Sequence, residues 1–135
     1  SVDLGCRYMV SPGFTDDLLN AAQQASIPLL PGVSTVSEVM RAMQFGYRDF
    51  KFFPAGACGG VAFIKALQGP FKSAKFCPTG GVDVDNMGDY LALGNVLAVG
   101  GSWVAPRALV RAKRWSEIER LARHATSLNT GDIGG

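Results

Sequence analysis

The chain has 135 residues, 47% of them hydrophobic and 18% charged, which is typical of one globular domain with a buried core. Its net charge of +2 is too small to indicate binding to nucleic acid or to an anionic membrane surface. No apolar stretch approaches the roughly 20 residues of a membrane span, and the first residues lack the features of a signal peptide. We therefore expect neither a nucleic-acid partner nor a membrane partner.

The cysteines and the histidine exclude two further classes of protein. Three cysteines lie far apart in the chain, and only one histidine accompanies them. This pattern fits neither a disulfide framework nor a zinc site. Free thiols in a reducing cytoplasm are the simplest account, so we expect a cytoplasmic protein without a bound metal.

Five short apolar runs, each ending in proline or glycine, recur at intervals of about 20 residues along the chain. They lie at 8–13, 27–32, 50–54, 75–81 and 96–102. A helical pattern follows each run, and strands that alternate with helices indicate parallel strands joined by crossover helices. The sequence therefore predicts an α/β fold with a buried parallel sheet.

Four helix starts are predicted from capping residues. Thr15 is expected to cap a helix over 16–25, and Asp85 a helix that continues through Leu93. Capping boxes are expected at Thr35–Glu38 and Ser116–Glu119. Basic residues around the last helix are interpreted as a solvated face, and 130–135 as a frayed tail.

Lys51 is the candidate catalytic residue. It lies in an aromatic, strand-like run between Phe50 and Phe53 that stops at Pro54. Burial among phenylalanines disfavours the ammonium form, and a neutral amine is a nucleophile that forms Schiff bases with ketones. The alternative is a structural lysine whose stem packs while its ammonium reaches water.

Two glycine-rich strand ends are candidate phosphate sites. Gly80-Gly81 and Gly100-Gly101-Ser102 follow the last two strands, where barrels commonly bind phosphate. Loops without side chains let backbone N–H groups approach an anion, and a following helix N-terminus would add a favourable dipole. The alternative is that these glycines merely turn the chain.

Five motifs in order resemble those of the 2-keto-3-deoxy-6-phosphogluconate (KDPG) aldolases, over about Tyr8 to Ala125. The motifs are Ser11-Pro12-Gly13, Ile27-Pro28-Leu29-Leu30-Pro31-Gly32-Val33-Ser34-Thr35, Phe50-Lys51-Phe52-Phe53-Pro54-Ala55, Phe76-Cys77-Pro78-Thr79-Gly80-Gly81 and Val99-Gly100-Gly101-Ser102-Trp103. The resemblance implies a class I aldolase with a (β/α)8 TIM barrel.

The resemblance also implies roles for individual residues. Lys51 would form the Schiff base, Phe53 would face the substrate, and Thr79, Gly80, Gly81, Gly101 and Ser102 would line the substrate and phosphate site. No cofactor and no metal would be needed. The partner would be a phosphorylated keto acid, KDPG, cleaved to pyruvate and glyceraldehyde 3-phosphate in the Entner–Doudoroff pathway. The same chemistry would cleave 4-hydroxy-2-oxoglutarate (KHG) to pyruvate and glyoxylate. The family implies a homo-oligomer, a trimer.

Two departures from the family pattern stand out. Gly56 follows Pro54-Ala55, where the family usually has glutamate. The family barrel also has three strand–helix units before the one that begins near Tyr8, and these carry the general acid/base glutamate and the arginine that holds the carboxylate. We therefore expect residues 1–135 to be the C-terminal part of a single (β/α)8 barrel domain, an incomplete barrel of about five units that is inactive alone.

Three other readings remain open from the residues. The chain could be a non-catalytic phosphate-binding barrel, a phosphosugar isomerase in which Lys51 is only an electrostatic contact, or an inactive interaction module. Trapping of pyruvate by borohydride separates them, because only an aldolase-type lysine becomes covalently labelled.

Overall fold

The computed structural model describes residues 4–129, so the tail predicted at 130–135 lies outside the described part. Strands alternate with helices, as predicted, except that the one strand predicted at 27–32 is two short strands, which belong to different sheets. In chain order the elements are β1 (Met9–Val10), α1 (Asp16–Gln23), β2 (Leu29–Leu30), β3 (Gly32–Val33), α2 (Val36–Gln44), β4 (Asp49–Phe52), α3 (Gly60–Ala66), β5 (Lys75–Pro78), α4 (Met87–Leu91), η2 (Ser102–Val104), α5 (Arg107–Arg111) and α6 (Trp115–Asn129). Within 4–129, no helix combines the length and apolar character that a membrane crossing needs.

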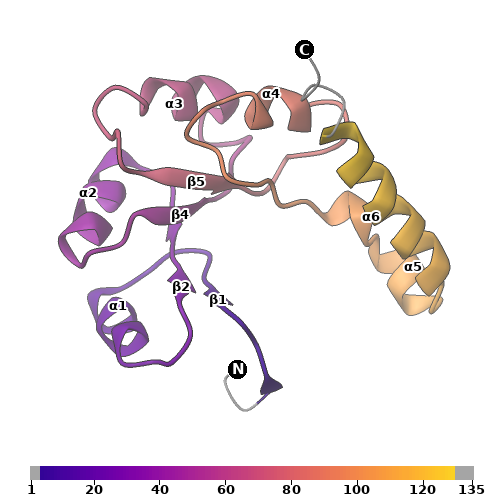
Figure 1. The fold of residues 1–135 in the computed structure, drawn as a ribbon, viewed down its shortest axis with the longest axis horizontal. Helices are drawn as coiled ribbons and strands as arrows, with labels where there is room; N and C mark the ends of the chain where they lie inside the picture. The colour runs from indigo at the N-terminus through magenta and orange to yellow at the C-terminus, as the bar shows by residue number, and fades with distance from the viewer. Residues whose placement is uncertain (1–3, 130–135) are drawn as a thin grey trace.

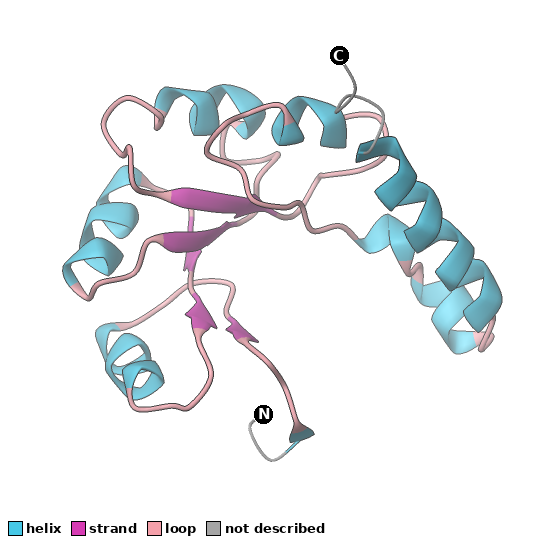
Figure 2. Ribbon diagram, in the orientation of Figure 1, coloured by secondary structure: helices cyan, strands magenta, loops and turns pink. Residues whose placement is uncertain are grey.

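Every strand pair is parallel, which confirms the predicted α/β class. One sheet pairs β1 with β2, and the second has the order β3-β4-β5. In the second sheet Lys51 pairs with Gly32 on one side and with Cys77 on the other. Figures 1 and 2 show the strands on the inside of an arc and helices α1 to α4 on its outside.

The fifth predicted strand, near 96–102, is wrong as a continuous strand. Only two isolated parallel bridges join it to the β5 region, Phe76 to Val96 and Thr79 to Gly100. From the first bridge to the second the chain takes four steps on one side, Val96 to Gly100, and three on the other, Phe76 to Thr79. One extra residue therefore interrupts the pairing, as in a β-bulge.

The core lies between the strands and the helices, and residue alternation on β4 decides which side chains enter it. Phe50 and Phe52 are fully buried. The Phe52 ring stacks on Phe63 of α3 at 5.2 Å between centroids, and Phe50 contacts Phe76 at 5.8 Å. Because side chains alternate between the faces of a strand, Lys51 lies on the opposite face, away from the helices.

Two of the predicted caps are confirmed. The Thr15 hydroxyl accepts a hydrogen bond from the Leu18 N–H, and Thr35 and Glu38 form the complete capping box of α2. Asp85 does not cap α4. Asp83 instead accepts hydrogen bonds from the N–H groups of Asp85 and Asn86, because the turn before α4 brings it closer to the free donors.

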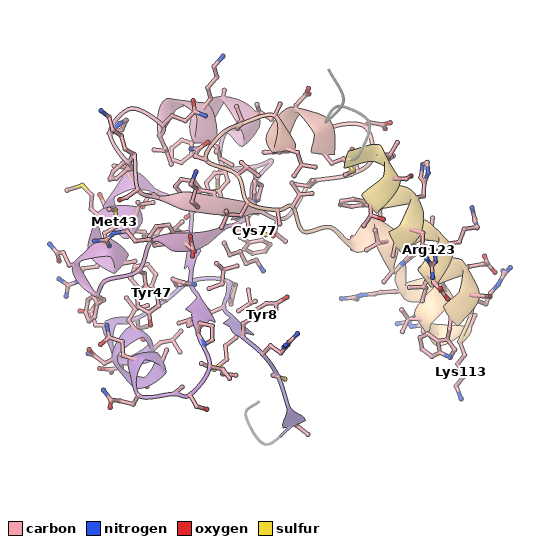
Figure 3. All side chains as sticks on the ribbon, in the orientation of Figure 1. Tyr8, Met43, Tyr47, Cys77, Lys113 and Arg123 are labelled. Carbon is pink, nitrogen blue, oxygen red and sulfur yellow. The ribbon has the colours of Figure 1, made fainter. Side chains whose placement is uncertain are left out.

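The capping box predicted at Ser116 is also wrong, because Ser116 lies inside α6. Lys113 turns the chain at φ 55°, and the Arg114 carbonyl accepts from the N–H groups of Glu117 and Ile118, so the helix starts earlier. The basic residues of this region are exposed, as predicted for a solvated face. Figure 3 places Lys113 and Arg123 on the α5–α6 arm, away from Cys77 on β5.

Candidate active site

Lys51 lies on β4 among short or aromatic side chains. It is half-buried, and its Nζ lies 4.6 Å from the centroid of the Phe53 ring. Its neighbour on β3, Gly32, has no room for a side chain, because a Cβ there would overlap the backbone of Pro12. The amine is therefore held beside an aromatic ring, on the face of β4 that the helices do not cover.

A cavity of about 380 Å³ lies at the carboxyl ends of β4 and β5. Its lining consists of Phe53, Thr79, Gly80, Gly81, Val82, Gly101 and Ser102. All six residues predicted to bind substrate or phosphate are brought together there, from three separate segments of the chain. Lys51 does not line this cavity itself, but its amine faces the ring of Phe53, which does. Val82 is the one lining residue that the sequence did not suggest.

Two glycines of the cavity require glycine for conformational reasons. Gly80 and Gly81 have φ of +88° and +76°, a region that other residues rarely adopt. A Cβ on Gly80 would also lie 3.2 Å from the Phe53 ring. Within residues 4–129, the backbone N–H groups of Gly81, Gly101 and Ser102 donate no hydrogen bond to the protein. These donors suit an anion.

The loop after the lysine motif supports the glycine loop through the backbone. The N–H groups of Ala55 and Gly56 donate to the carbonyls of Thr79 and Gly80 at 2.8 and 2.9 Å. Gly56, the departure from the family pattern, thus lies against the cavity loop. No α-helix starts directly after either glycine pair: α4 begins only at Met87, and the element that follows Gly101 is η2, a 3-10 helix of three residues. The loop therefore offers an anion its backbone N–H groups and not the helix dipole that the sequence led us to expect.

Cys77 is a neighbour of Lys51 that the sequence reasoning missed. It pairs with Lys51 across β4 and β5, and it is a free, half-buried thiol. Burial raises the pKa of Cys77, while a hydrogen bond with Thr79 and the charge of Lys51 lower it to a smaller extent. Strand alternation puts Cys77 and Thr79 on one face of their segment, but the register between β4 and β5, which places Cys77 beside Lys51, is not a local signal.

Among residues 4–129, no carboxylate lines the cavity. Glu38 accepts hydrogen bonds from the N–H groups of Ser34 and Thr35 and from the Ser34 hydroxyl. Burial by itself would raise the pKa of Glu38, but these bonds with Ser34 and Thr35 together outweigh it and hold the pKa below its usual value. Asp83 is engaged at the start of α4. Among the described residues, no group of three or more metal-binding side chains is found.

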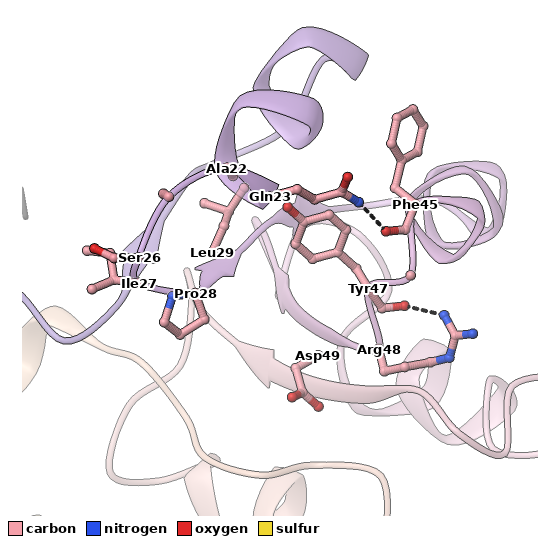
Figure 4. A pocket seen from close by; sticks show the side chains of 12 residues that line it. Ala22, Gln23, Ser26, Ile27, Pro28, Leu29, Phe45, Tyr47, Arg48 and Asp49 are labelled. Atoms are coloured by element: carbon pink, nitrogen blue, oxygen red, sulfur yellow. Dashed lines mark hydrogen bonds between the residues drawn. The ribbon is translucent and has the colours of Figure 1, made fainter.

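A larger cavity, of about 490 Å³, lies at the opposite ends of the strands (Figure 4). Three of its polar side chains are already engaged: Gln23 donates to the Phe45 carbonyl at 2.6 Å, Arg48 to the Tyr47 carbonyl at 2.7 Å and Tyr47 to the Leu19 carbonyl at 3.1 Å. In parallel α/β folds the chemistry lies at the carboxyl ends of the strands. The smaller cavity is therefore the candidate site.

Comparison with known proteins points to one family. The family model described as "KDPG and KHG aldolase" matches residues 2–121. The 2-dehydro-3-deoxy-phosphogluconate aldolase of Pseudomonas aeruginosa is 51% identical over 121 residues, which cover 90% of this chain and 55% of that protein. The chain thus spans little more than half the length of this curated relative.

Two solved structures are similar in fold as well as in sequence. A KDPG aldolase from Legionella pneumophila, solved with pyruvate captured as a covalent carbinolamine intermediate, matches with a TM-score of 0.86 and 49% identity, over 89% of this chain and 58% of that one. The 2-keto-3-deoxy-6-phosphogluconate aldolase of Zymomonas mobilis ZM4 with 3-phosphoglycerate matches with a TM-score of 0.82 and 38% identity, over 92% of this chain and 58% of that one.

Proposed function

The chain belongs to the KDPG and KHG aldolase family, and from that premise we propose that it carries the Schiff-base lysine and the phosphate site of a class I aldolase. The substrate is KDPG, cleaved to pyruvate and glyceraldehyde 3-phosphate, and KHG is cleaved in the same way to pyruvate and glyoxylate. The observation that carries the proposal is the placement of Lys51 beside Phe53, next to a cavity formed by all six predicted binding residues.

Lys51 acts as the nucleophile in this proposal. Its neutral amine attacks the keto carbon to give a carbinolamine, which loses water to become an iminium ion. A general base then takes the proton of the substrate hydroxyl beside the bond that breaks; the carbon–carbon bond breaks, its electron pair moves into the iminium to form an enamine, and the hydroxyl carbon leaves as the aldehyde. Protonation of the enamine carbon and hydrolysis release pyruvate and restore the amine. The relative from Legionella pneumophila, solved with a pyruvate carbinolamine, supports this role.

The phosphate binds in the cavity beside this lysine. Gly80, Gly81, Gly101 and Ser102 approach it with the backbone, and the free N–H groups of the last three donate to it. Thr79 and Phe53 border the reacting end of the substrate. The relative from Zymomonas mobilis ZM4 was solved with a phosphorylated acid, 3-phosphoglycerate, which supports a phosphate subsite in this family.

The described residues form part of a (β/α)8 barrel in this proposal, as its last five strand–helix units in one domain. Two features support it: the chain covers 55% of its relative from Pseudomonas aeruginosa, and Val10 and Leu97, on the first and last runs, are 47% and 58% exposed. Three further units would supply the general acid/base and the group that binds the carboxylate. We also propose a cytoplasmic homotrimer, by family resemblance.

Borohydride trapping tests the proposal. We define the complete barrel as this chain preceded by three strand–helix units, for example those of the relative from Pseudomonas aeruginosa. With pyruvate and borohydride, the complete barrel should gain the mass of one reduced pyruvate at Lys51. Lys51→Ala should abolish both the label and turnover, whereas Lys65→Ala, at an exposed position on α3, should keep both.

Three outcomes would contradict parts of this proposal. Full labelling of the Lys51→Ala variant would show that Lys51 is not the nucleophile. Failure of the unaltered complete barrel to trap pyruvate would favour a phosphate-binding barrel or a phosphosugar isomerase. Residues 1–135 alone should not cleave KDPG, because losing a general acid/base costs about 10²–10⁴-fold; measurable cleavage by the isolated chain would refute the need for further units.

A further inference from the structure

Gly101 is a glycine for a different reason than Gly80 and Gly81. Its φ of −156° is extended backbone that any residue adopts, so conformation does not require glycine there. A Cβ on Gly101 would instead overlap the ring of Trp103, and the three atoms nearest to that position all belong to this ring. The Trp103 ring therefore lies directly against the backbone of Gly101.

Trp103 packs against the hydrophobic core and also borders a second cavity. It is half-buried on η2, which packs against α6. Its ring borders an apolar cavity of about 340 Å³ that Met87, Leu97, Ala122 and Ala125 also line. Gly101 lines this apolar cavity and the phosphate cavity alike. Gly101 is thus the residue that separates the ring of Trp103 from the phosphate cavity.

We propose that Trp103 is a positioning residue for the phosphate subsite. The ring fixes the backbone of 100–102, so that the N–H groups of Gly101 and Ser102 are already aimed at the anion when it arrives. Donors held in place before binding cost less entropy to order, which strengthens binding without any contact between the ring and the ligand. The inference rests on the proposed function, because it takes the phosphate subsite as its starting point.

The first test compares two substrates in the complete barrel. Let the preference be kcat/KM for KDPG divided by kcat/KM for its unphosphorylated analogue. Trp103→Ala should lower this preference about 10-fold, since freeing the backbone of one residue is worth roughly one decade in affinity. Trp103→Phe, which retains a ring, should recover most of it, and Trp115→Ala, at a residue that is 59% exposed, should leave it unchanged.

A double variant tests the contact itself. Gly101→Ala should lower the preference while the ring is present, because the new methyl group and the ring cannot share the space. In the Trp103→Ala background the same change should cost little more, since its closest obstacle is gone. Additive losses in the double variant would show that the two positions act independently and would overturn the inference.

The effect of phosphate binding on Trp103 can also be measured without turnover. The protein is labelled with 5-fluorotryptophan, and the fluorine NMR signals are assigned with Trp103→Phe and Trp115→Phe. Inorganic phosphate should shift the Trp103 signal in a saturable manner and leave Trp115 in place. In the Gly81→Val variant the shift should be lost at the same phosphate concentrations.

The outcomes separate this inference from the aldolase proposal. Failure of the aldolase proposal appears as absent pyruvate trapping, whatever phosphate does to Trp103. An unmoved Trp103 signal in phosphate, or an unchanged substrate preference in a folded Trp103→Ala variant that still traps pyruvate, would overturn the positioning role. Equal losses for both substrates in that variant would also overturn it, because they would show only a structural role.

Discussion

Replacing Gly81 tests the phosphate site most directly. Any other residue at this backbone conformation is strained, so adding a Cβ should displace the N–H group of residue 81. The φ of Gly81 is +76°, and a Cβ there would meet the nearest backbone atom of Gly56 at 3.4 Å, an ordinary contact. Gly81→Ala therefore adds conformational strain with little overlap. Gly81→Val adds a branched side chain to a loop that lines the cavity. We expect the N–H group of residue 81 to move away from its anion-binding position in both variants.

The size of the effect follows from two contributions. A non-glycine residue in this conformation costs about 1–3 kcal/mol, which should appear as lost stability. Losing one hydrogen bond to a charged group costs about 1.5–3 kcal/mol, or roughly 10- to 150-fold in kcat/KM for the phosphorylated substrate. The unphosphorylated analogue never makes this bond, so its kcat/KM should fall much less.

The assay measures kcat/KM of the complete barrel with KDPG and with its unphosphorylated analogue, together with urea unfolding. Gly88→Ala is the matched control, because Gly88 lies in α4 with nothing within 4 Å of a new Cβ. Alanine in a helix is more favourable than glycine by about 1 kcal/mol, so this control should keep activity and not lose stability. Equal losses for both substrates in the Gly81 variants would refute the phosphate role of this loop.

Two further predictions concern titrating groups. Alkylation of Cys77 by iodoacetamide, followed by mass spectrometry, should be much slower near neutral pH than alkylation of the exposed Cys6, because burial raises the pKa of Cys77. Lys51→Met should slow the alkylation of Cys77 further, since the charge of Lys51 lowers that pKa. Labelling of Cys77 as fast as that of Cys6 would contradict the site geometry. Burial alone would raise the pKa of Glu38, but hydrogen bonds with Ser34 and Thr35 hold the pKa below its usual value. The Glu38 carboxylate therefore stabilises the fold at pH values above the usual glutamate pKa, and this stabilisation is lost as the pH falls through the lowered pKa. Glu38→Gln should thus lower the free energy of unfolding by about 1 kcal/mol near neutral pH and by less in acid. The control Glu119→Gln, at an exposed ion pair, should change it little at either pH. A loss of stability in Glu38→Gln that does not depend on pH would count against this account.

Local signals in the sequence predicted most of the fold. The Thr15 cap and the Thr35 capping box are confirmed because each bonds residues three positions away, a relation that the sequence contains directly. The other two caps were wrong although the bonds that replace them are also local, because the course of the backbone turn decides which neighbouring group reaches the free donors. Asp83 reaches the donors before α4, and the turn at Lys113 brings the Arg114 carbonyl to the start of α6.

The candidate site shows the same division. Residues two positions apart on an extended chain share a face, so Lys51 and Phe53 are expected on the same side, and their contact agrees with that. The glycines at 80 and 81 were expected to form a loop that approaches an anion, and they line the cavity with unpaired N–H groups nearby. The neighbour of Lys51 on the next strand, Cys77, was missed, because register between strands is set by packing and not by either strand alone.

By itself, the sequence determined the class of fold, the family and the identity of the residues at the strand ends, because these depend on spacing, alternation and short motifs. The tertiary structure alone decided that Phe53, Thr79, Gly81 and Ser102 enclose one cavity, since they come from segments up to 49 positions apart (102 minus 53). It also decided why residue 101 is a glycine. No local rule demands it at an extended φ, and the reason is the ring of Trp103, which the packing of η2 on α6 places against that backbone.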